Sequence, residues 1–478
     1  MTTLACTLAA ALGAAEVAGQ VPITTASPEA REIYLQGRDA FERLRFEDAR
    51  RLFARAAEKD PDFALAHLAL ANTAASARGF FDELRRAVAL AGKASEGERH
   101  VILAQDAAAR GDPAGARSHY DALVAAFPDD GRARTLLGNW HFGRQEYPAA
   151  IEQYRKSTAL APTFSQAWNQ LGYAHRSLGQ YAEAEKAFRR YAELIPDEPN
   201  PWDSQAELLM KVGRFQESID AYRKALSVNP HFVASYVGIA HDQLLLGQAE
   251  EARRTLAKLR TEVARNDGER RQALLWTATS FVHEGRTAEA LRACRDLHGV
   301  AEKGKDPLAM SGDLVQMGQI LLHAGRHGEA AERFAQAVKV AAGADVPDEV
   351  KENVRRNQLY YQARVAIERG DLKAAAARSE AYRTAAAAKK IPFELRRIHE
   401  LAGLLALHQK SWAEAVAQLE QAGQQDPEVL FHLALAHLGR GDAARARQLL
   451  AGVADFNELN LNWAFVRARA RKLLEAKG

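Results

Sequence analysis

Four prolines recur at a constant interval in the first half of the chain. Pro128, Pro162, Pro196 and Pro230 each lie 34 residues after the one before. Because proline cannot continue an α-helix, each of them marks a place where a helical segment stops. Equal intervals of this kind constrain the chain to fold as a series of similar units.

The segment that ends at Pro196 shows what one unit contains. Its first half places residues three and four positions apart, on one face of a helix, at Trp168, Leu171 and Gly172. The second half repeats the four-residue spacing with Ala184 and Phe188. Gly179 lies between the halves and suits the left-handed residue that ends a helix. The segment therefore predicts a helix, a tight turn, a second helix and a stop.

The spacing lengthens towards the C-terminus. The glycines predicted to separate paired helices are 34, 38, 40 and 45 residues apart, at Gly213, Gly247, Gly285, Gly325 and Gly370. We expect about twelve units, with a regular array at 27–262 and longer, degenerate repeats at 263–450. Residues 451–478 should form a helix that caps the exposed end of the array, since one face carries an apolar stripe. The alternative for this basic segment is a tail that contacts anionic lipid or nucleic acid.

The 34-residue period, with Trp-x2-Leu-Gly, then Ala-x3-Phe, then Pro, resembles the tetratricopeptide repeat. Trp168, Gly172, Ala184, Phe188 and Pro196 stand at positions of that pattern. The chain looks like a stand-alone bacterial protein of this type. The resemblance implies an all-α fold, an α-solenoid superhelix of helix-turn-helix units with a concave inner face and a C-terminal capping helix. Trp168 is expected in the core, so that Trp168→Ala would cost about 3–5 kcal/mol.

Composition excludes several classes of protein. The chain carries 64 basic and 61 acidic residues, a net charge of +3, which gives no general attraction to nucleic acid. Its two cysteines are Cys6 and Cys294. Cys6 falls in the N-terminal apolar segment, so no disulfide framework is expected. Cys294 takes the place of Phe188 in its unit, which predicts a core residue rather than a reactive thiol.

The N-terminal 26 residues form a separate segment. They contain no Lys or Arg, and Leu4 to Ala15 is an apolar run too short to cross a bilayer but suited to the core of a signal peptide. Export to a periplasmic or secreted location is the resulting prediction. The missing positive start favours the alternative, an alanine-rich frayed N-terminus of a cytoplasmic protein. No later apolar stretch of about 20 residues predicts a transmembrane anchor.

Residues with the spacing of a catalytic or metal site are absent from the sequence. His399-Glu400 begins like a metalloprotease motif, but position 403 is glycine. His323 and His327 are four residues apart, and Gly325 places a helix break between them. No phosphate-binding glycine loop or nucleophile elbow follows a strand. We therefore expect no enzyme, cofactor, metal ion or small-molecule substrate.

Binding of a protein or peptide is the function that remains. The first helix of each unit should line the concave groove, and its inward positions in three central units hold amides, an aromatic and both charges: Asn139, Asn169, Gln170, Tyr173, Arg176, Asp203, Ser204 and Glu207. Amides and tyrosine can hydrogen-bond the backbone of an extended peptide. In later units the same positions are more apolar, at Leu275, Val315 and Tyr360. The bland alternative is a hydrated concave surface that binds nothing.

The expected function is thus a non-enzymatic scaffold or adaptor that binds another protein through the concave face. Two alternatives stay open. An RNA-binding helical array would need a basic, aromatic-rich stripe, which the mixed charges at Arg176, Asp203 and Glu207 do not provide. A regulatory or substrate-docking module of an enzyme complex would leave the catalyst on another chain.

Overall fold

The computed structural model describes residues 19–476, and within them the regular structure is entirely helical. Helices α1 to α24 pair in sequence as twelve antiparallel hairpins, and α25 follows them. This confirms the predicted all-α solenoid. The bounds are α1 Pro28–Glu42, α2 Phe46–Lys59, α3 Ala64–Asn72, α4 Ala77–Leu90, α5 Glu96–Ala109, α6 Pro113–Ala126, α7 Gly131–Gly143, α8 Tyr147–Leu160, α9 Ser165–Ser177, α10 Tyr181–Leu194, α11 Asn200–Lys211, α12 Phe215–Val228, α13 Val233–Leu245, α14 Ala249–Lys258, α15 Asp267–His283, α16 Thr287–Lys303, α17 Pro307–His323, α18 His327–Ala342, α19 Asp348–Glu368, α20 Leu372–Lys389, α21 Pro392–His408, α22 Trp412–Leu419, α23 Pro427–Arg440, α24 Ala443–Ala454 and α25 Trp463–Glu475.

Turn residues and caps set where these helices begin and end. The predicted inter-helix glycines all adopt a positive φ, between 71° and 80°, at Gly179, Gly213, Gly247, Gly285, Gly325 and Gly370. Only glycine takes up this conformation without a steric cost. At the first helix, the Ser27 side chain accepts a hydrogen bond from the Ala30 amide, with proline at the next position.

The periodic prolines have a second role that their spacing alone does not show. In four successive units the proline carbonyl accepts a hydrogen bond from the side chain six residues later: Arg134 to Pro128, Trp168 to Pro162, Trp202 to Pro196 and Tyr236 to Pro230. The donor lies on the following helix, so each contact fixes the turn between one unit and the next. It also corrects the core assignment of Trp168, which is only half-buried because its indole reaches out to this turn.

Within a hairpin, small residues of the first helix admit a large ring from the second. A Cβ built on Gly172 would lie 2.5 Å from the ring of Phe188, which is completely buried. Gly138 and Gly318 approach Tyr154 and Phe334 in the same way. Side-chain atoms cannot approach that closely, so these positions need glycine. The predicted core residue Cys294 is also fully buried, and burial raises the pKa of its thiol to about 12.

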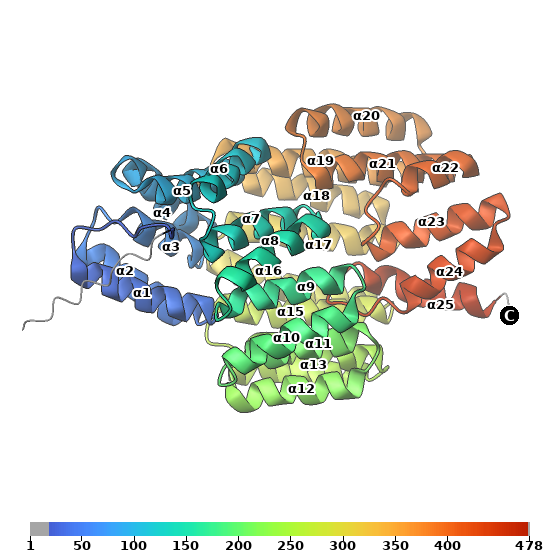
Figure 1. Ribbon diagram of the computed structural model, residues 1–478. Helices are drawn as coiled ribbons and strands as arrows, with labels where there is room; N and C mark the ends of the chain where they lie inside the picture. Colours follow the sequence, from blue (N-terminus) through green and yellow to red (C-terminus); the bar gives the residue numbers. More distant parts are fainter. Residues whose placement is uncertain (1–18, 477–478) are drawn as a thin grey trace, which may run out of the picture.

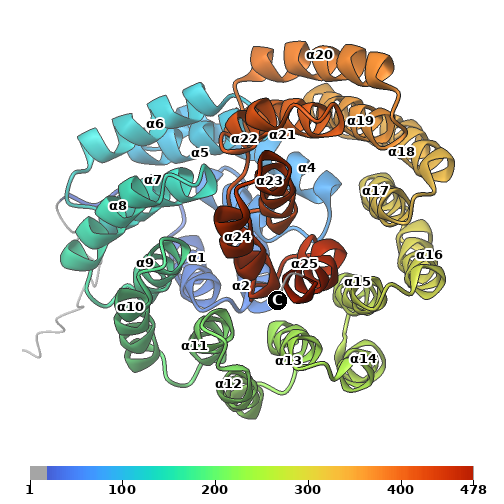
Figure 2. The same cartoon turned by 90° about the vertical axis from the view of Figure 1, so that its right-hand side faces the viewer.

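The hairpins follow one another around a ring. Figure 2 shows the odd-numbered helices from α7 to α17 on the inside and the even-numbered helices on the outside. In this projection α23, α24 and α25 fall inside the ring, and Figure 1 shows that they stand at its right-hand end, to the right of α9, α15 and α17. The first hairpin is tied to a later part of the ring, since Arg43 and Arg45 both pair with Glu198, just before α11.

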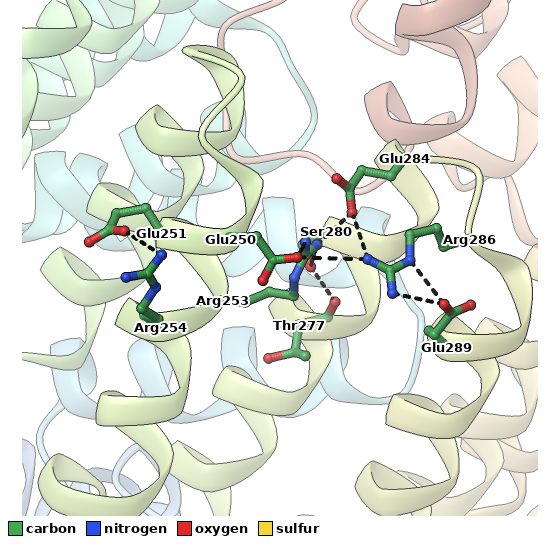
Figure 3. A network of polar contacts seen from close by, with 9 residues as sticks. All are labelled: Glu250, Glu251, Arg253, Arg254, Thr277, Ser280, Glu284, Arg286 and Glu289. Atoms are coloured by element: carbon green, nitrogen blue, oxygen red, sulfur yellow. Dashed lines mark hydrogen bonds and ion pairs between the residues drawn. The ribbon is translucent and has the colours of Figure 1, made fainter.

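A polar network joins three helices where the repeat interval lengthens from 34 to 38 residues (Figure 3). Arg253 on α14 pairs with Glu250 and, at 2.7 Å, with Glu284, which directly follows α15. Arg286 pairs with Glu289 of α16 at 2.8 Å and stacks over Phe281 at 4.8 Å. Exposed ion pairs contribute at most about 1 kcal/mol each, so the network aligns neighbouring units and adds little stability.

Within residues 19–476, no helix is long and apolar enough to cross a membrane. Residues 1–18, which hold most of the predicted signal segment, lie outside the described part of the chain.

Candidate interaction surface

The predicted groove residues of α9 and α11 do lie together on the inner wall, but they bond mainly to one another. Asn169 is buried, accepts a hydrogen bond from the Ser204 hydroxyl at 3.0 Å and donates to Asn200 at 3.4 Å. The Tyr173 hydroxyl is 3.2 Å from the same serine. Since each contact crosses from α9 to α11, these side chains fix the angle between two units.

The charged members of the set are paired as well. Arg176 donates to Glu207 at 2.7 Å and stacks over the ring of Tyr173 at 4.8 Å. Both side chains of this ion pair keep a little exposure, 17% for Arg176 and 19% for Glu207. Asp203 is buried and accepts from Ser235 of α13 at 2.7 Å, and its burial raises the pKa of its carboxyl to about 8.

Two predicted residues present more of their surface. Asn139 on α7 is exposed, and its carbonyl oxygen accepts a hydrogen bond from Tyr154 at 2.8 Å. Gln170 on α9 is half-buried, one position after the buried Asn169. These side chains, with the Arg176–Glu207 pair, are therefore the ones of the predicted set that a partner could reach on this wall.

The chain's own C-terminal segment lies against the inner wall from α11 onwards. Residues 455–462 form an irregular stretch between α24 and α25. Glu458 forms an ion pair with Lys211 of α11, and the Lys211 ammonium also lies 5.1 Å from the ring of Phe456. Phe456 is buried in the same apolar cluster as residues of α13 and α14, and Leu459 packs against that cluster.

Helix α25 continues across the inner wall and also packs against α23 and α24. Trp463 at its start is completely buried, with its ring centroid 5.0 Å from that of His241 on α13 and 4.5 Å from that of His283 on α15. Phe465 stacks on His323 of α17 at 4.0 Å. The predicted capping helix thus covers the end hairpin and spans the ring at the same time.

One sequence signal pointed to this coverage. The inward positions of the later units are more apolar than those of the central ones, and Val315 of α17 packs against the same apolar cluster as Phe465 of α25. An apolar stripe shows that something covers it, but a sequence pattern cannot say which of many distant segments does so.

The N-terminal segment is also held as an extended stretch. Its backbone amides donate to carboxylates at the starts of successive units, from Val21 to Asp130 at 2.8 Å, from Thr24 to Glu98 at 2.8 Å and from Ala26 to Asp60 at 2.9 Å. Asp130 and Asp60 belong to the turns that precede α7 and α3, and Glu98 lies in the first turn of α5, so the segment crosses three units.

A buried ionic cluster between α19, α21 and α23 is the part of the structure that most resembles a catalytic centre. Arg364 pairs with Glu428 and, at 3.2 Å, with Glu400, which also accepts from the Tyr360 hydroxyl at 2.6 Å. A cavity of about 240 Å³ adjoins it. Despite burial, the neighbouring arginine holds the pKa of Glu428 well below its usual range, whereas burial raises the pKa of Glu400. Among the described residues no group of three or more His, Cys, Asp or Glu side chains could hold a metal ion.

Models of known protein families match several parts of the chain. Models described as tetratricopeptide repeat match residues 34–93, 103–163 and 141–199, and a second such model matches residues 201–232. The chain therefore carries tetratricopeptide repeats between residues 34 and 232. Proteins with these repeats are generally non-enzymatic scaffolds, and their fold is typical of proteins that bind other proteins.

Several solved structures of tetratricopeptide proteins are similar to the chain. A tetratricopeptide repeat protein from Parabacteroides merdae ATCC 43184 is 17% identical over 55% of this chain and 99% of its own, with a TM-score of 0.38. MamA residues 41 to the end, from Desulfovibrio magneticus RS-1, are 15% identical over 34% of this chain and 93% of their own, with a TM-score of 0.30. A chain of the Cut9–Hcn1 hetero-tetramer of APC/C is 13% identical over 94% of this chain and 76% of its own, with a TM-score of 0.43. The search of curated proteins gives no match.

Proposed function

We propose that this protein is a non-enzymatic scaffold that binds an extended segment of a partner protein along the inner wall of its ring. The observation that carries the proposal is that the repeat array holds extended polypeptide already. Residues 21–26 donate their amides to acids at the starts of three units, and residues 455–462 lie against α11. A partner segment would make contacts of the same two kinds, backbone hydrogen bonds to acidic side chains and side-chain packing against an inner helix.

The inner wall of α7 and α9 supports the same function. Asn139 and Gln170 supply amides, and the Arg176–Glu207 pair supplies both charges at the surface. Amide groups hydrogen-bond an extended backbone irrespective of its side chains, and the ion pair adds selectivity for the charge of the ligand. The mixed charges of this wall disfavour a phosphate backbone, for which a continuous basic stripe would be needed.

Affinity capture with two matched variants tests the proposal. Gln170→Arg adds bulk and charge to the inner wall, whereas Gln216→Arg makes the same change at an exposed position on the outer helix α12. After nuclease treatment, we expect Gln170→Arg to capture at least ten-fold less partner protein than the wild type does. Gln216→Arg should capture as much as the wild type. Equal recovery with both variants would show that the inner wall is not the binding surface. Binding that disappears with nuclease would favour the RNA-binding alternative.

A further inference from the structure

The C-terminal segment occupies its place on the inner wall with many polar atoms left without partners. Within the described part of the chain, neither ring nitrogen of His241 has a hydrogen-bond partner, and the same holds for Nδ1 of His283, the Trp463 indole nitrogen and Oδ1 of Asn457. A buried polar atom without a partner is unfavourable, because it has given up its hydrogen bonds to water and gained none in return. The seat of this segment is therefore less favourable than the α9–α11 wall, where the equivalent polar atoms bond across the helices.

Charge adds to this cost. Arg467 of α25 is 2% exposed, and its Nε and Nη1 atoms have no hydrogen-bond partner among residues 19–476. The groups that face it are His241 of α13 and His283 of α15, together with Arg471 and Asp455 of its own segment. The guanidinium thus lies among nitrogen donors and the ring of Trp463, 5.4 Å away, without a bonded carboxylate.

The anchors at the front of the segment are better matched. Lys211 meets a carboxylate at Glu458 and an aromatic face at Phe456, and Leu459 fills the adjoining apolar cluster. This end specifies a sequence chemistry: an extended stretch with a carboxylate between an aromatic and an aliphatic side chain.

We propose that residues 455–475 are an intramolecular ligand, and that the partner presents an extended, acidic and apolar segment of the same chemistry, which displaces them from α11, α13 and α15. This inference rests on the proposed scaffold function and names the partner of the same wall. A partner segment that pairs with the ring nitrogens of His241 and His283 would gain what the internal segment lacks, and displacement would return the Arg467 guanidinium to water. Because the internal segment is tethered, its high effective concentration would exclude weaker ligands.

A labelled synthetic peptide of residues 454–466 tests the exchange directly. Measured by fluorescence anisotropy on the full chain, it should bind the Glu458→Lys variant at least ten-fold more tightly than the wild type, because the variant's own segment no longer pairs with Lys211. A peptide with lysine in place of Glu458 should lose this binding. The double variant Lys211→Glu/Glu458→Lys restores the ion pair with reversed sign, so it should bind the original peptide as weakly as the wild type.

The proposal would be overturned if circular dichroism shows that Glu458→Lys is folded and the variant binds the peptide no more tightly than the wild type. Concentration-dependent dimerisation of that variant would overturn it too, because the occupant would then be a second copy. If the variant does not fold, hydrogen exchange on the wild type tests the proposal instead. The amides of residues 455–475 should exchange at least ten-fold faster than those of α13 and α15. Equal protection would contradict displacement of the segment. The peptide assay uses no cellular partner, so its outcome is independent of the capture experiment with Gln170→Arg.

Discussion

At the scale of single residues, the conspicuous members of the repeat pattern divide into two roles. Phe188 is fully buried under Gly172, where no side chain fits between ring and helix. Trp168 is half-buried and donates its indole N–H to the Pro162 carbonyl at 3.0 Å. The sequence pattern treats both as core positions, whereas the structure makes one a core residue and the other a link between units.

This difference predicts unequal costs of truncation. Phe188→Ala should lower the free energy of unfolding by about 3–5 kcal/mol, as removal of a fully buried aromatic does. Trp168→Ala should cost about 1–2 kcal/mol, because part of its side-chain surface is already exposed to water. Urea denaturation of both variants measures the two costs. An equal loss for Trp168→Ala would return this residue to the core.

At the scale of elements, the start of helix α7 serves two purposes. Asp130 caps α7 by accepting from the amides of Arg132 at 2.7 Å and Ala133 at 3.0 Å. Its second oxygen accepts from Val21. A capping residue and an anchor for the N-terminal segment are therefore the same side chain, which couples the order of residues 21–26 to the order of the helix.

Asp130→Ala should consequently cost more than loss of a cap alone. Asp112→Ala, which removes only the cap of α6 to Gly115, is the matched control and should cost about 1 kcal/mol. Asp130→Ala should cost about 2 kcal/mol, since the contact with Val21 adds a hydrogen bond to a charged group. Urea denaturation gives both values, and hydrogen exchange should show faster exchange at residues 21–26 only for Asp130→Ala. Similar costs and unchanged exchange would argue against the anchor.

At the scale of the whole molecule, contacts between distant repeats close the array. Tyr147 donates to Gln425 at 3.1 Å across 278 positions of sequence, and Glu198 holds the first hairpin through Arg43 and Arg45. A linear solenoid has only neighbour contacts and unfolds in parts. Here the ring and the C-terminal helices at its end bury ionisable groups from several units, which links global stability to pH.

Asp242 on α13 gives the clearest pH dependence. It is completely buried, and burial raises the pKa of its carboxyl to about 8, against 3.8 as its ordinary value. As pH rises between these values the unfolded chain releases a proton that the folded chain keeps, so stability falls by about 1.4 kcal/mol per pH unit. Burial lowers the pKa of His241 to about 3, which makes stability rise with pH, but only below about 6.5.

Between pH 6.5 and 7.5 the carboxylate effect therefore stands alone among these groups. Asp242→Asn should therefore lose less free energy of unfolding between these pH values than the wild type does. Part of the loss should remain, because the pKa of Asp203 is also raised to about 8. Urea midpoints at the two pH values test this, with Asp220→Asn on the exposed face of α12 as the control. A slope in Asp242→Asn as steep as in the wild type would contradict it.

The sequence by itself determined the local architecture of this protein. The prolines at 34-residue intervals, the turn glycines and the pairing of Gly172 with Phe188 depend on residues close in the chain. Their periodicity therefore predicts the hairpins and their approximate number. The candidate groove residues of α9 and α11 lie side by side, because they occupy the same register in successive units. Their hydrogen bonds to each other could not be predicted, since these depend on the angle between adjacent units.

Only the tertiary structure decided what covers the inner wall. Small rotations between successive units add up around the ring, and their sum brings Phe456, Glu458 and Trp463 onto helices that lie some 200 residues earlier in the chain. The apolar inward positions of the later units needed some cover, but many segments of suitable composition could have supplied it. The chain's own C-terminal segment supplies the cover because it follows the last hairpin, α23–α24, which Figure 2 shows directed towards the centre of the array.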